Sequence, residues 1–318
     1  MPFEHILGQS RPLNIVRRML SSGKIPHAFL FTGIAGLGKY TTAMALAKAL
    51  NCTQSTSDFC GACVSCKKIE AGTHPDITLI GPEKNVIKIV QIRSLQQDIV
   101  FAPIEAAWRV IIIDQAETMN KETANCLLKT LEEPPSATVL ILVASATSRL
   151  LPTVLSRCQK IIFAPLARHT LQTLLENEGT PREQVQAVVA HAHGSLHRAR
   201  QLLDTSLIDD FAALTSTMTA PGTVGACFEL AGTLSKSPER LSALLILLLE
   251  WLRDLLLFRQ GADTQQFFNA DQPESLRQAA QLIEPYRLEK KITQVLHLMT
   301  AQHHNINMQL GLESLLLS

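Results

Sequence analysis

A nine-residue segment of the chain carries the residue types that bind phosphate groups. Residues 33–41 read Gly-Ile-Ala-Gly-Leu-Gly-Lys-Tyr-Thr and match the pattern G-x-x-x-x-G-K-[ST] except at its last position. Glycines allow backbone N–H groups to approach phosphate oxygens closely, and Lys39 has the length to reach the outer phosphates. The candidate nucleotide-binding residues are therefore Gly33, Gly36, Gly38, Lys39 and Thr41, with a tight turn that binds nothing as the alternative.

The residue after Lys39 departs from this pattern. A serine or threonine there normally supplies a hydroxyl ligand to magnesium, whereas Tyr40 holds its phenol too far from the backbone. Thr41 comes one position late, so its hydroxyl leaves the predicted helix on another side. The segment predicts a loop that can cradle phosphate without placing magnesium in the usual way.

A second candidate position follows the apolar run at residues 111–113. Asp114 stands where a strand should end, which suits a carboxylate that positions magnesium, so we add it to the nucleotide-binding candidates. Gln115 comes next, and its amide cannot act as a general base toward an attacking water. We expect Glu117 to be an ordinary charge near a helix start and not a substitute for that base.

Four of the seven cysteines form a group with metal-ligand spacing, Cys52-x7-Cys60-x2-Cys63-x2-Cys66. Four thiolates around one ion suit a closed tetrahedral zinc site, which is structural because no ligand position stays open. The alternatives are unliganded surface cysteines and an iron–sulfur cluster. His74 is a further possible ligand, although we expect it to be polar surface. An odd number of cysteines without a secretory signal indicates reduced thiols and not a disulfide framework.

The segments around these residues have the order strand, loop, helix that a phosphate loop requires. An apolar strand at 27–32 leads into the glycines, and an alanine-rich helix at 42–50 follows them. Further strands are expected in a buried parallel sheet, and a helix is expected at 121–131 before two prolines. These strands lie at 77–80, 109–113, 138–144 and 160–163.

After residue 165 the sequence predicts only helices, with a loop rich in Thr, Gly and Pro at 215–224. The fold class is therefore α/β for the first half and all-helical for the second. We divide the chain into domains at 1–165, 166–207 and 208–318.

The composition limits the function classes. With 29 basic and 28 acidic residues the formal net charge is +1, which argues against a stand-alone nucleic-acid binder. The longest apolar run, residues 243–249, is far shorter than the roughly 20 residues of a membrane span. No basic segment followed by an apolar one opens the chain, so we expect a cytoplasmic protein.

Together these features resemble the clamp-loader ATPase family of bacterial DNA polymerase III, part of the AAA+ class. The resemblance covers nearly the whole chain and is most specific in four further motifs. These are His74-Pro75-Asp76, Ile89-x-Gln91-Ile92-Arg93, the segment 125–135 with Leu131-Glu132-Glu133-Pro134-Pro135, and Leu155-Ser156-Arg157-Cys158. Ile6-Leu7-Gly8-Gln9 also looks like the family's adenine-side segment. It implies an AAA+ P-loop sheet domain with an inserted zinc module near 52–66, followed by a helical lid domain and a helical collar domain.

Within this family the chain resembles most the delta-prime type of subunit, which typically does not hydrolyse ATP. Tyr40 and Gln115 favour that type over the gamma/tau motor. The motor's Gly-Ser-x-Arg motif reads Gly-Ser-Leu-His at 194–197, so that Arg198 is displaced by one residue, roughly 100° around a helix. Ser145 matches the family's polar sensor position.

The resemblance also assigns a catalytic role to Arg157. In the family this arginine projects into the ATP site of the adjacent subunit, where its planar and permanent charge can stabilise the transferring phosphoryl group. The alternative is a surface arginine that holds its own loop. Arg93, on a predicted helix at 91–99, is linked in the family to sensing DNA, and a solvated charged face is the alternative there.

The leading hypothesis is a subunit that completes a neighbour's ATP site and helps to load a sliding clamp onto primed DNA. Its implied partners are gamma/tau and delta subunits in a hetero-pentamer, and the clamp and primer–template DNA through that complex. Structural zinc is the implied cofactor, and ATP or ADP at the chain's own loop stays open. The alternatives are a working gamma/tau-type ATPase and a zinc-containing nucleic-acid binder acting alone.

Overall fold

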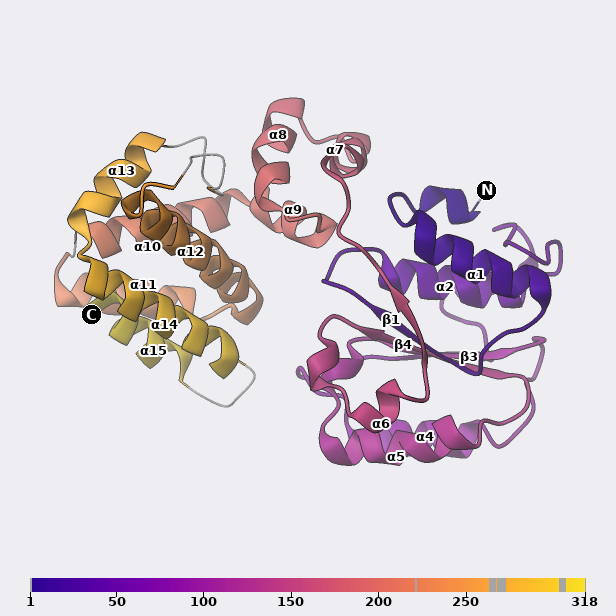
Figure 1. Cartoon of the computed structure of the whole chain (residues 1–318). Coiled ribbons are helices and arrows are strands. Elements are labelled where there is room, and N and C mark those ends of the chain that lie inside the picture. The colour runs from indigo at the N-terminus through magenta and orange to yellow at the C-terminus, as the bar shows by residue number, and fades with distance from the viewer. Residues whose placement is uncertain (1, 221, 263–266, 268–272, 303–306, 318) are drawn as a thin grey trace. The chain divides into compact units, whose positions relative to one another are not determined.

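The computed structural model describes residues 2–220, 222–262, 267, 273–302 and 307–317 (Figure 1). The chain forms two compact units. The first comprises residues up to 174 together with 194–197, and the second comprises 175–193 and the residues from 198 onward. Each unit is described by itself below. The division into three domains stays a prediction.

The first unit is built on a five-stranded sheet in the order β2-β3-β4-β1-β5, in which all neighbouring strands are parallel. β1, β3 and β4 are buried at every residue, as expected for strands covered on both faces. The strands are β1 (Ala28–Thr32), β2 (Ile77–Ile80), β3 (Arg109–Ile113), β4 (Thr138–Ala144) and β5 (Gln159–Ile162).

Helices cover both faces of this sheet (Figure 1). On one face, α4 (Ile89–Asp98), α5 (Lys121–Glu132) and α6 (Pro152–Leu155) share a core with alternate residues of β1, β3 and β4. α1 (Ser10–Ser22) and α2 (Lys39–Leu50) lie on the other face, where Phe29 and Phe31 are buried. Short elements connect them: η1 (Pro2–His5), α3 (Val64–Glu70), η2 (Ala116–Thr118) and η3 (Thr147–Arg149).

Beyond the sheet the described chain is helical. α7 (Arg168–Asn177) runs across the boundary between the units, and leucines dominate the core of the second unit. Its helices are α8 (Arg182–His191), α9 (Leu196–Leu202), α10 (Thr205–Thr219), α11 (Val224–Leu234), α12 (Pro238–Arg259), α13 (Pro273–Leu282), α14 (Pro285–Ala301) and α15 (Met308–Leu317). The predicted fold class, a parallel α/β sheet domain followed by helices, is confirmed.

The loop predicted at 215–224 is wrong in its first half, because α10 continues to Thr219. The carboxylate of Asp204 caps this helix by accepting a hydrogen bond from the Ser206 N–H at 3.0 Å. Threonine hydroxyls usually compete with a helix, but here Thr215, Thr217 and Thr219 each donate to the carbonyl four residues earlier. Threonine content alone therefore gave a misleading loop signal.

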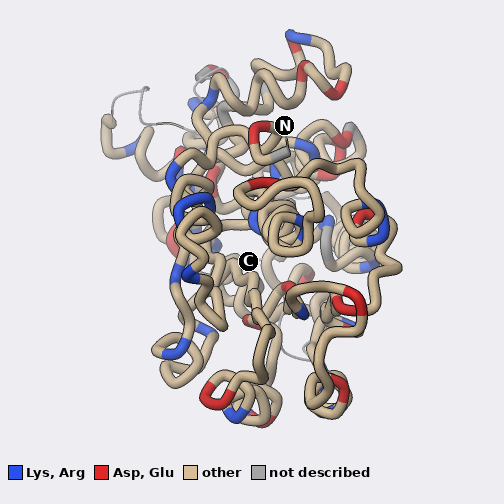
Figure 2. The backbone as a smooth tube through the Cα atoms, turned by 90° about the vertical axis from the view of Figure 1, so that its right-hand side faces the viewer, with Lys and Arg blue, Asp and Glu red and all other residues tan. Residues whose placement is uncertain are grey.

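The charged residues show no long stretch of one sign along the described part of the tube (Figure 2). This agrees with the near-neutral composition. Within the described ranges, no helix combines the length and apolarity needed to cross a bilayer.

Candidate nucleotide site and cysteine centre

The candidate nucleotide residues gather at the edge where the parallel strands end. β1 runs into the glycine loop, β3 into Asp114 and β4 into Ser145. In open parallel sheets, ligands bind outside the carboxyl ends of the strands. The structure therefore brings Gly33, Gly36, Gly38, Lys39 and Asp114 to one edge, as the sequence predicts.

The loop itself has the backbone that glycines allow. Gly36 and Gly38 have φ angles of +75° and +80°, and Gly38 precedes the first turn of α2. A Cβ atom at Gly36 would lie 2.4 Å from the backbone nitrogen of His197, so no other residue fits this close approach. The N-terminus of α2 offers N–H groups and the positive end of its dipole to an anion.

Lys39 is almost fully buried and folds over the loop. Its Nζ donates to the carbonyl oxygens of Gly33 at 2.5 Å and Ile34 at 2.6 Å, and to Ser145 Oγ at 3.3 Å. Burial lowers the pKa of Lys39, and the negative charges of Glu117 and Asp114 partly offset that effect. The ammonium group is thus held at the loop by backbone oxygens and faced by two carboxylates.

Asp114 and Glu117 form a like-charge pair beside Lys39. Burial raises the pKa of Asp114, and the charge of Glu117 raises it further. Glu117 Oε1 accepts a hydrogen bond from the Ser145 N–H at 2.9 Å, while its buried Oε2 has no partner among the described residues. Glu117 does lie in the first turn of η2, as expected, but its carboxylate also binds the backbone N–H of Ser145, which was not predicted from the sequence. Its position three residues after Asp114 was the available signal.

The structure shows where the residues that depart from the ATPase pattern lie and what their side chains contact. Tyr40 is 41% exposed, and burial together with the nearby charge of Asp114 raises the pKa of its phenol. Thr41 is exposed, and the buried Thr42 uses its hydroxyl to donate to the Gly38 carbonyl at 2.8 Å. Gln115 is exposed at a φ of +51°. None of these groups supplies the short hydroxyl or the carboxylate of a hydrolysing site.

The turn at 194–197 packs on the phosphate loop within the first unit. Ser195 Oγ donates to the Ala35 carbonyl at 2.8 Å, and the Leu196 N–H donates to the Gly36 carbonyl at 3.2 Å. Arg198, one residue further, belongs to the second unit and pairs with Glu250 at 2.6 Å. A described carboxylate thus engages the displaced arginine.

Arg157 lies at the opposite edge of the sheet. It precedes the first residue of β5, which is parallel to β1 and in register with it, whereas the phosphate loop follows the last residue of β1. The strands separate these edges by roughly 15 Å. The Arg157 guanidinium donates to the Thr153 carbonyl at 2.9 Å and pairs with Glu132 at 2.6 Å. The pairing with Glu132 was not predicted from the sequence.

The four clustered cysteines come together. Their sulfur atoms all lie within 4.8 Å of one another. Among the described residues, this group could hold a metal ion through four cysteine ligands. A tetrahedral zinc site with Zn–S bonds of about 2.3 Å needs sulfur separations of about 3.8 Å. Backbone N–H groups already point at three sulfurs, for example that of Cys63 at Cys60 Sγ, 3.2 Å away. The donor set fits zinc.

The thiol pKa values in this cluster diverge. Burial works against ionisation of Cys63, but hydrogen bonds from Cys66 and Thr53 outweigh it and lower its pKa to about 6. Burial raises the pKa of Cys66 to about 12, and its hydrogen bond with Cys63 adds to the effect. One proton leaves such a cluster easily while the next is retained, unless a cation compensates the accumulating charge. Zinc would supply that charge to all four sulfurs.

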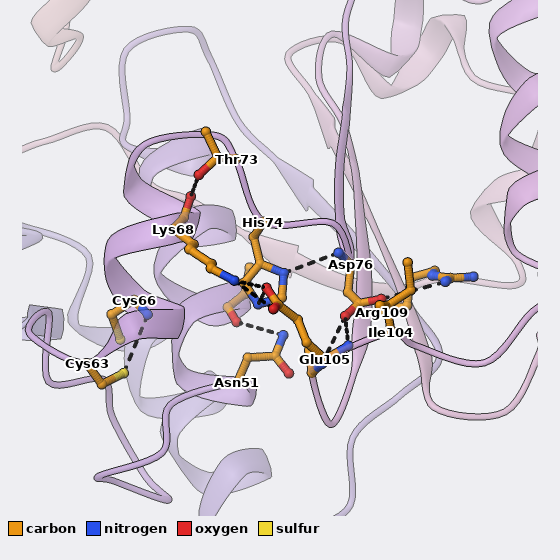
Figure 3. Close-up of polar contacts among 12 residues, drawn as sticks. Asn51, Cys63, Cys66, Lys68, Thr73, His74, Asp76, Ile104, Glu105 and Arg109 are labelled. Atoms are coloured by element: carbon orange, nitrogen blue, oxygen red, sulfur yellow. Dashed lines mark hydrogen bonds and ion pairs between the residues drawn. The ribbon is translucent and has the colours of Figure 1, made fainter.

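Ion pairs join α3, which carries Cys66, to α2 and to the loop before β3. Lys48 of α2 pairs with Glu70 of α3, and Lys68 of α3 donates to both oxygens of Glu105, at 2.6 and 2.8 Å. Figure 3 shows Glu105 between Lys68 and His74, whose Nε2 lies 3.7 Å from it. His74 is buried and accepts from the Asp76 N–H at 3.2 Å, so the expectation of polar surface is wrong for it.

Asp76 is fully buried at the amino-terminal edge of β2. Its carboxylate accepts hydrogen bonds from the backbone N–H groups of residues 104, 105 and 106 at 2.6–2.9 Å, and Arg109 lies 3.6 Å away (Figure 3). Burial opposes its ionisation, but these N–H groups and Arg109 prevail and lower its pKa. The His-Pro-Asp motif is thus a structural corner that shapes the loop before β3.

Family models match both halves of the chain. The model described as "DNA polymerase III, delta subunit" matches residues 8–167, and the one described as "DNA polymerase III, delta subunit, C terminal" matches 208–318.

Curated relatives agree with the family models. The "DNA polymerase III subunit delta'" of Bacillus subtilis is 36% identical over 54% of this chain and 53% of its own length. The subunit of the same name in Pseudomonas aeruginosa is 38% identical over 55% of each chain. The "DNA polymerase III subunit gamma" of Buchnera aphidicola is 33% identical over 64% of this chain and 58% of its own length. The matched part spans just over half the length of these relatives.

Proposed function

Because the chain belongs to the DNA polymerase III delta subunit family, whose motifs it carries, we propose that it is a delta-prime-type subunit of a clamp loader. It does not hydrolyse ATP itself and donates Arg157 to the ATP site of a neighbouring subunit. In the cytoplasm, with gamma/tau and delta subunits in a hetero-pentamer, it helps to load the sliding clamp onto primer–template DNA.

One observation carries this proposal, namely that Arg157 and the phosphate loop lie at opposite edges of a parallel sheet. The strands between them hold the guanidinium too far from the chain's own loop to act there, whereas a surface edge is open to another chain. Tyr40 and Gln115 support an idle site of its own. Arg198 is paired with Glu250, which supports the absence of a nucleotide sensor at that position.

The residues of the loop and of the cysteine cluster keep binding roles in this proposal. Gly33, Gly36, Gly38 and Lys39, with Thr41 and Asp114, are the residues that would hold ADP or ATP as a static ligand. Structural zinc occupies Cys52, Cys60, Cys63 and Cys66. Bound zinc supplies charge that stabilises four thiolates and so fixes the module that packs on α2.

A gamma/tau-type ATPase is the second candidate. Two observations favour it: Glu117 faces Lys39 from the strand edge, and the gamma relative matches a longer part of the chain than the delta' relatives do. The purified chain should therefore be assayed for ATP hydrolysis, with Lys39→Ala as its control. Turnover that disappears with Lys39→Ala would replace the first proposal with the second.

The reconstituted complex tests the role of Arg157 directly. Arg157→Ala should lower ATP turnover at the neighbour's site by about 10³-fold or more, as loss of an arginine finger does. Lys39→Ala should leave that turnover unchanged. Equal ATPase and clamp loading with Ala at 157 would show that this arginine only holds its own loop.

A further inference from the structure

Arg157 is held by a specific carboxylate, that of Glu132 at the last residue of α5. Glu132 Oε1 lies 2.6 Å from Arg157 Nη2, and Arg157 Nη1 donates to the Thr153 carbonyl at 2.9 Å. The side chains are 49% and 34% exposed, so solvent and any docking chain can reach the pair. The guanidinium thus lies folded back on its own unit, with two of its nitrogens engaged.

The neighbouring residue provides a contrast within the same turn. Glu133 is also exposed, but it forms no ion pair among the described residues. Two adjacent carboxylates of equal charge therefore differ in one respect, the contact with Arg157. The contact with Arg157 therefore depends on the position of Glu132. It is not explained by the negative charge that both residues bring to the end of α5.

We propose that Glu132 is a positioning residue. Its carboxylate holds Arg157 against its own unit and competes with the neighbour's nucleotide for the guanidinium group. This inference rests on the proposed function, in which Arg157 acts in trans. The guanidinium has to leave Glu132, or share its donors with a second anion, before it can bind a phosphate. Binding of the neighbour's nucleotide then weakens or breaks this exposed ion pair.

The expected effect follows from the strength of such a pair. Exposed ion pairs shift an equilibrium by a small factor, so removing the Glu132 charge should raise the population of free Arg157 by roughly 1.5- to 5-fold. Glu132→Gln should therefore increase kcat/KM for ATP of the reconstituted complex by that factor. A purely structural role for Glu132 predicts no increase, because loss of a support lowers activity or leaves it alone.

Three variants sharpen the measurement. Glu133→Gln is the matched control and should not change kcat/KM, because this carboxylate does not contact Arg157. Glu132→Asp keeps the charge on a shorter side chain and should lie between the wild type and Glu132→Gln. Combining Glu132→Gln with Arg157→Ala should give the activity of Arg157→Ala alone, because the Glu132 carboxylate acts only through the arginine that it holds.

The outcomes separate this inference from the proposed function. If Arg157→Ala lowers the ATPase activity of the complex while Glu132→Gln leaves kcat/KM unchanged or lowers it, Glu132 does not hold the arginine back. The proposed function then stands. If Arg157→Ala has no effect in the complex, both proposals fail together. An increase that Glu133→Gln reproduces would assign the effect to general charge and would also overturn the inference.

Discussion

Asp76 and Asp114 occupy opposite ends of neighbouring parallel strands, and their environments are opposite in kind. Asp76, before β2, has three backbone N–H donors and a buried arginine, and its pKa is lowered. Asp114, after β3, is half-buried beside the like charge of Glu117, and burial together with that charge raises its pKa. A carboxylate whose charge is compensated by hydrogen bonds and a nearby cation has a structural role. A carboxylate beside a like charge instead indicates the edge of the sheet where a charged ligand can bind.

The cysteine centre gives the largest test of this contrast, because its thiolates also need an external charge. Cys63→Ser should remove the bound zinc and unfold the segment around residues 52–66, since a structural zinc contributes about 10 kcal/mol or more of apparent binding free energy. Metal analysis should give about one zinc per wild-type chain and none in the variant. Cys126→Ser is the control, because that thiol lies outside the cluster. Equal zinc in both variants would contradict the assignment.

Asp76→Ala should be the most destabilising single change on the structural side. It leaves Arg109 buried without its anion and three backbone N–H groups without their acceptor, which costs about 3–5 kcal/mol. Urea unfolding measures the loss, with the exposed Asp98→Ala as control. A loss below about 1 kcal/mol would show that the corner is not needed for folding.

The pH dependence of unfolding tests the same carboxylate without a substitution. The folded pKa of Asp76 lies below the ordinary value of 3.8, so its contribution is fully present above the unfolded pKa. The contribution is lost as the pH falls through the folded pKa. Between pH 5 and pH 2 the wild type should therefore lose more unfolding free energy than Asp76→Ala does. Parallel curves would mean that Asp76 is not ionised preferentially in the folded state.

The second unit extends the comparison with a buried cation. Burial, together with the charges of Arg287 and Lys290, lowers the pKa of Lys291 from 10.5 to about 8, although its Nζ donates to the Leu315 carbonyl at 2.8 Å. The cost of burying this charge is fully present below pH 8 and is relieved as the pH rises toward 10.5. Lys291→Met should therefore be more stable than the wild type by about 1–3 kcal/mol at pH 7. That difference should shrink by pH 10, and a constant difference would contradict the pKa shift.

Asp114→Asn should have the smallest effect on folding. It removes a half-buried charge and its repulsion with Glu117 while also removing a favourable charge interaction with Lys39, so the unfolding free energy should change by no more than about 1 kcal/mol. Thermal unfolding checks this against Asp76→Ala. A loss as large as that of Asp76→Ala would place both aspartates in the structural class.

The strands, most of which are apolar at nearly every residue, were predictable from the sequence. Strands β2, β3 and β4 have the predicted bounds, and β5 lies one residue earlier than predicted. An apolar run of four to seven residues between polar turns has few alternatives in a parallel sheet. The part of α10 in the predicted loop was missed because the hydrogen bonds from its threonine hydroxyls to its own backbone appear only in the folded helix.

The site was predictable to the extent that its motifs are contiguous. The glycine loop and the cysteine spacing each predict the local structure that they form, because few loop conformations suit such glycines and few sites suit four thiolates. The role of Glu117 depends on Ser145, 28 residues away, and the partner of Arg157 is on another helix, 25 residues earlier in the chain. Such pairings are set by the packing of the sheet and its helices, which one sequence does not reveal.

The opposite placement of the glycine loop and Arg157 gives the first unit a direction. Chains with such a unit can complete one another's reaction centres only when arranged head to tail, and each contact then uses different faces of the two partners. Such a row has two unlike ends. Under the proposed function the loop of this chain does not hydrolyse ATP, so the chain would lose no activity at the end where that loop faces solvent. Under the proposed function, this polarity would place the chain at the end of the row where its own loop has no neighbour to complete it.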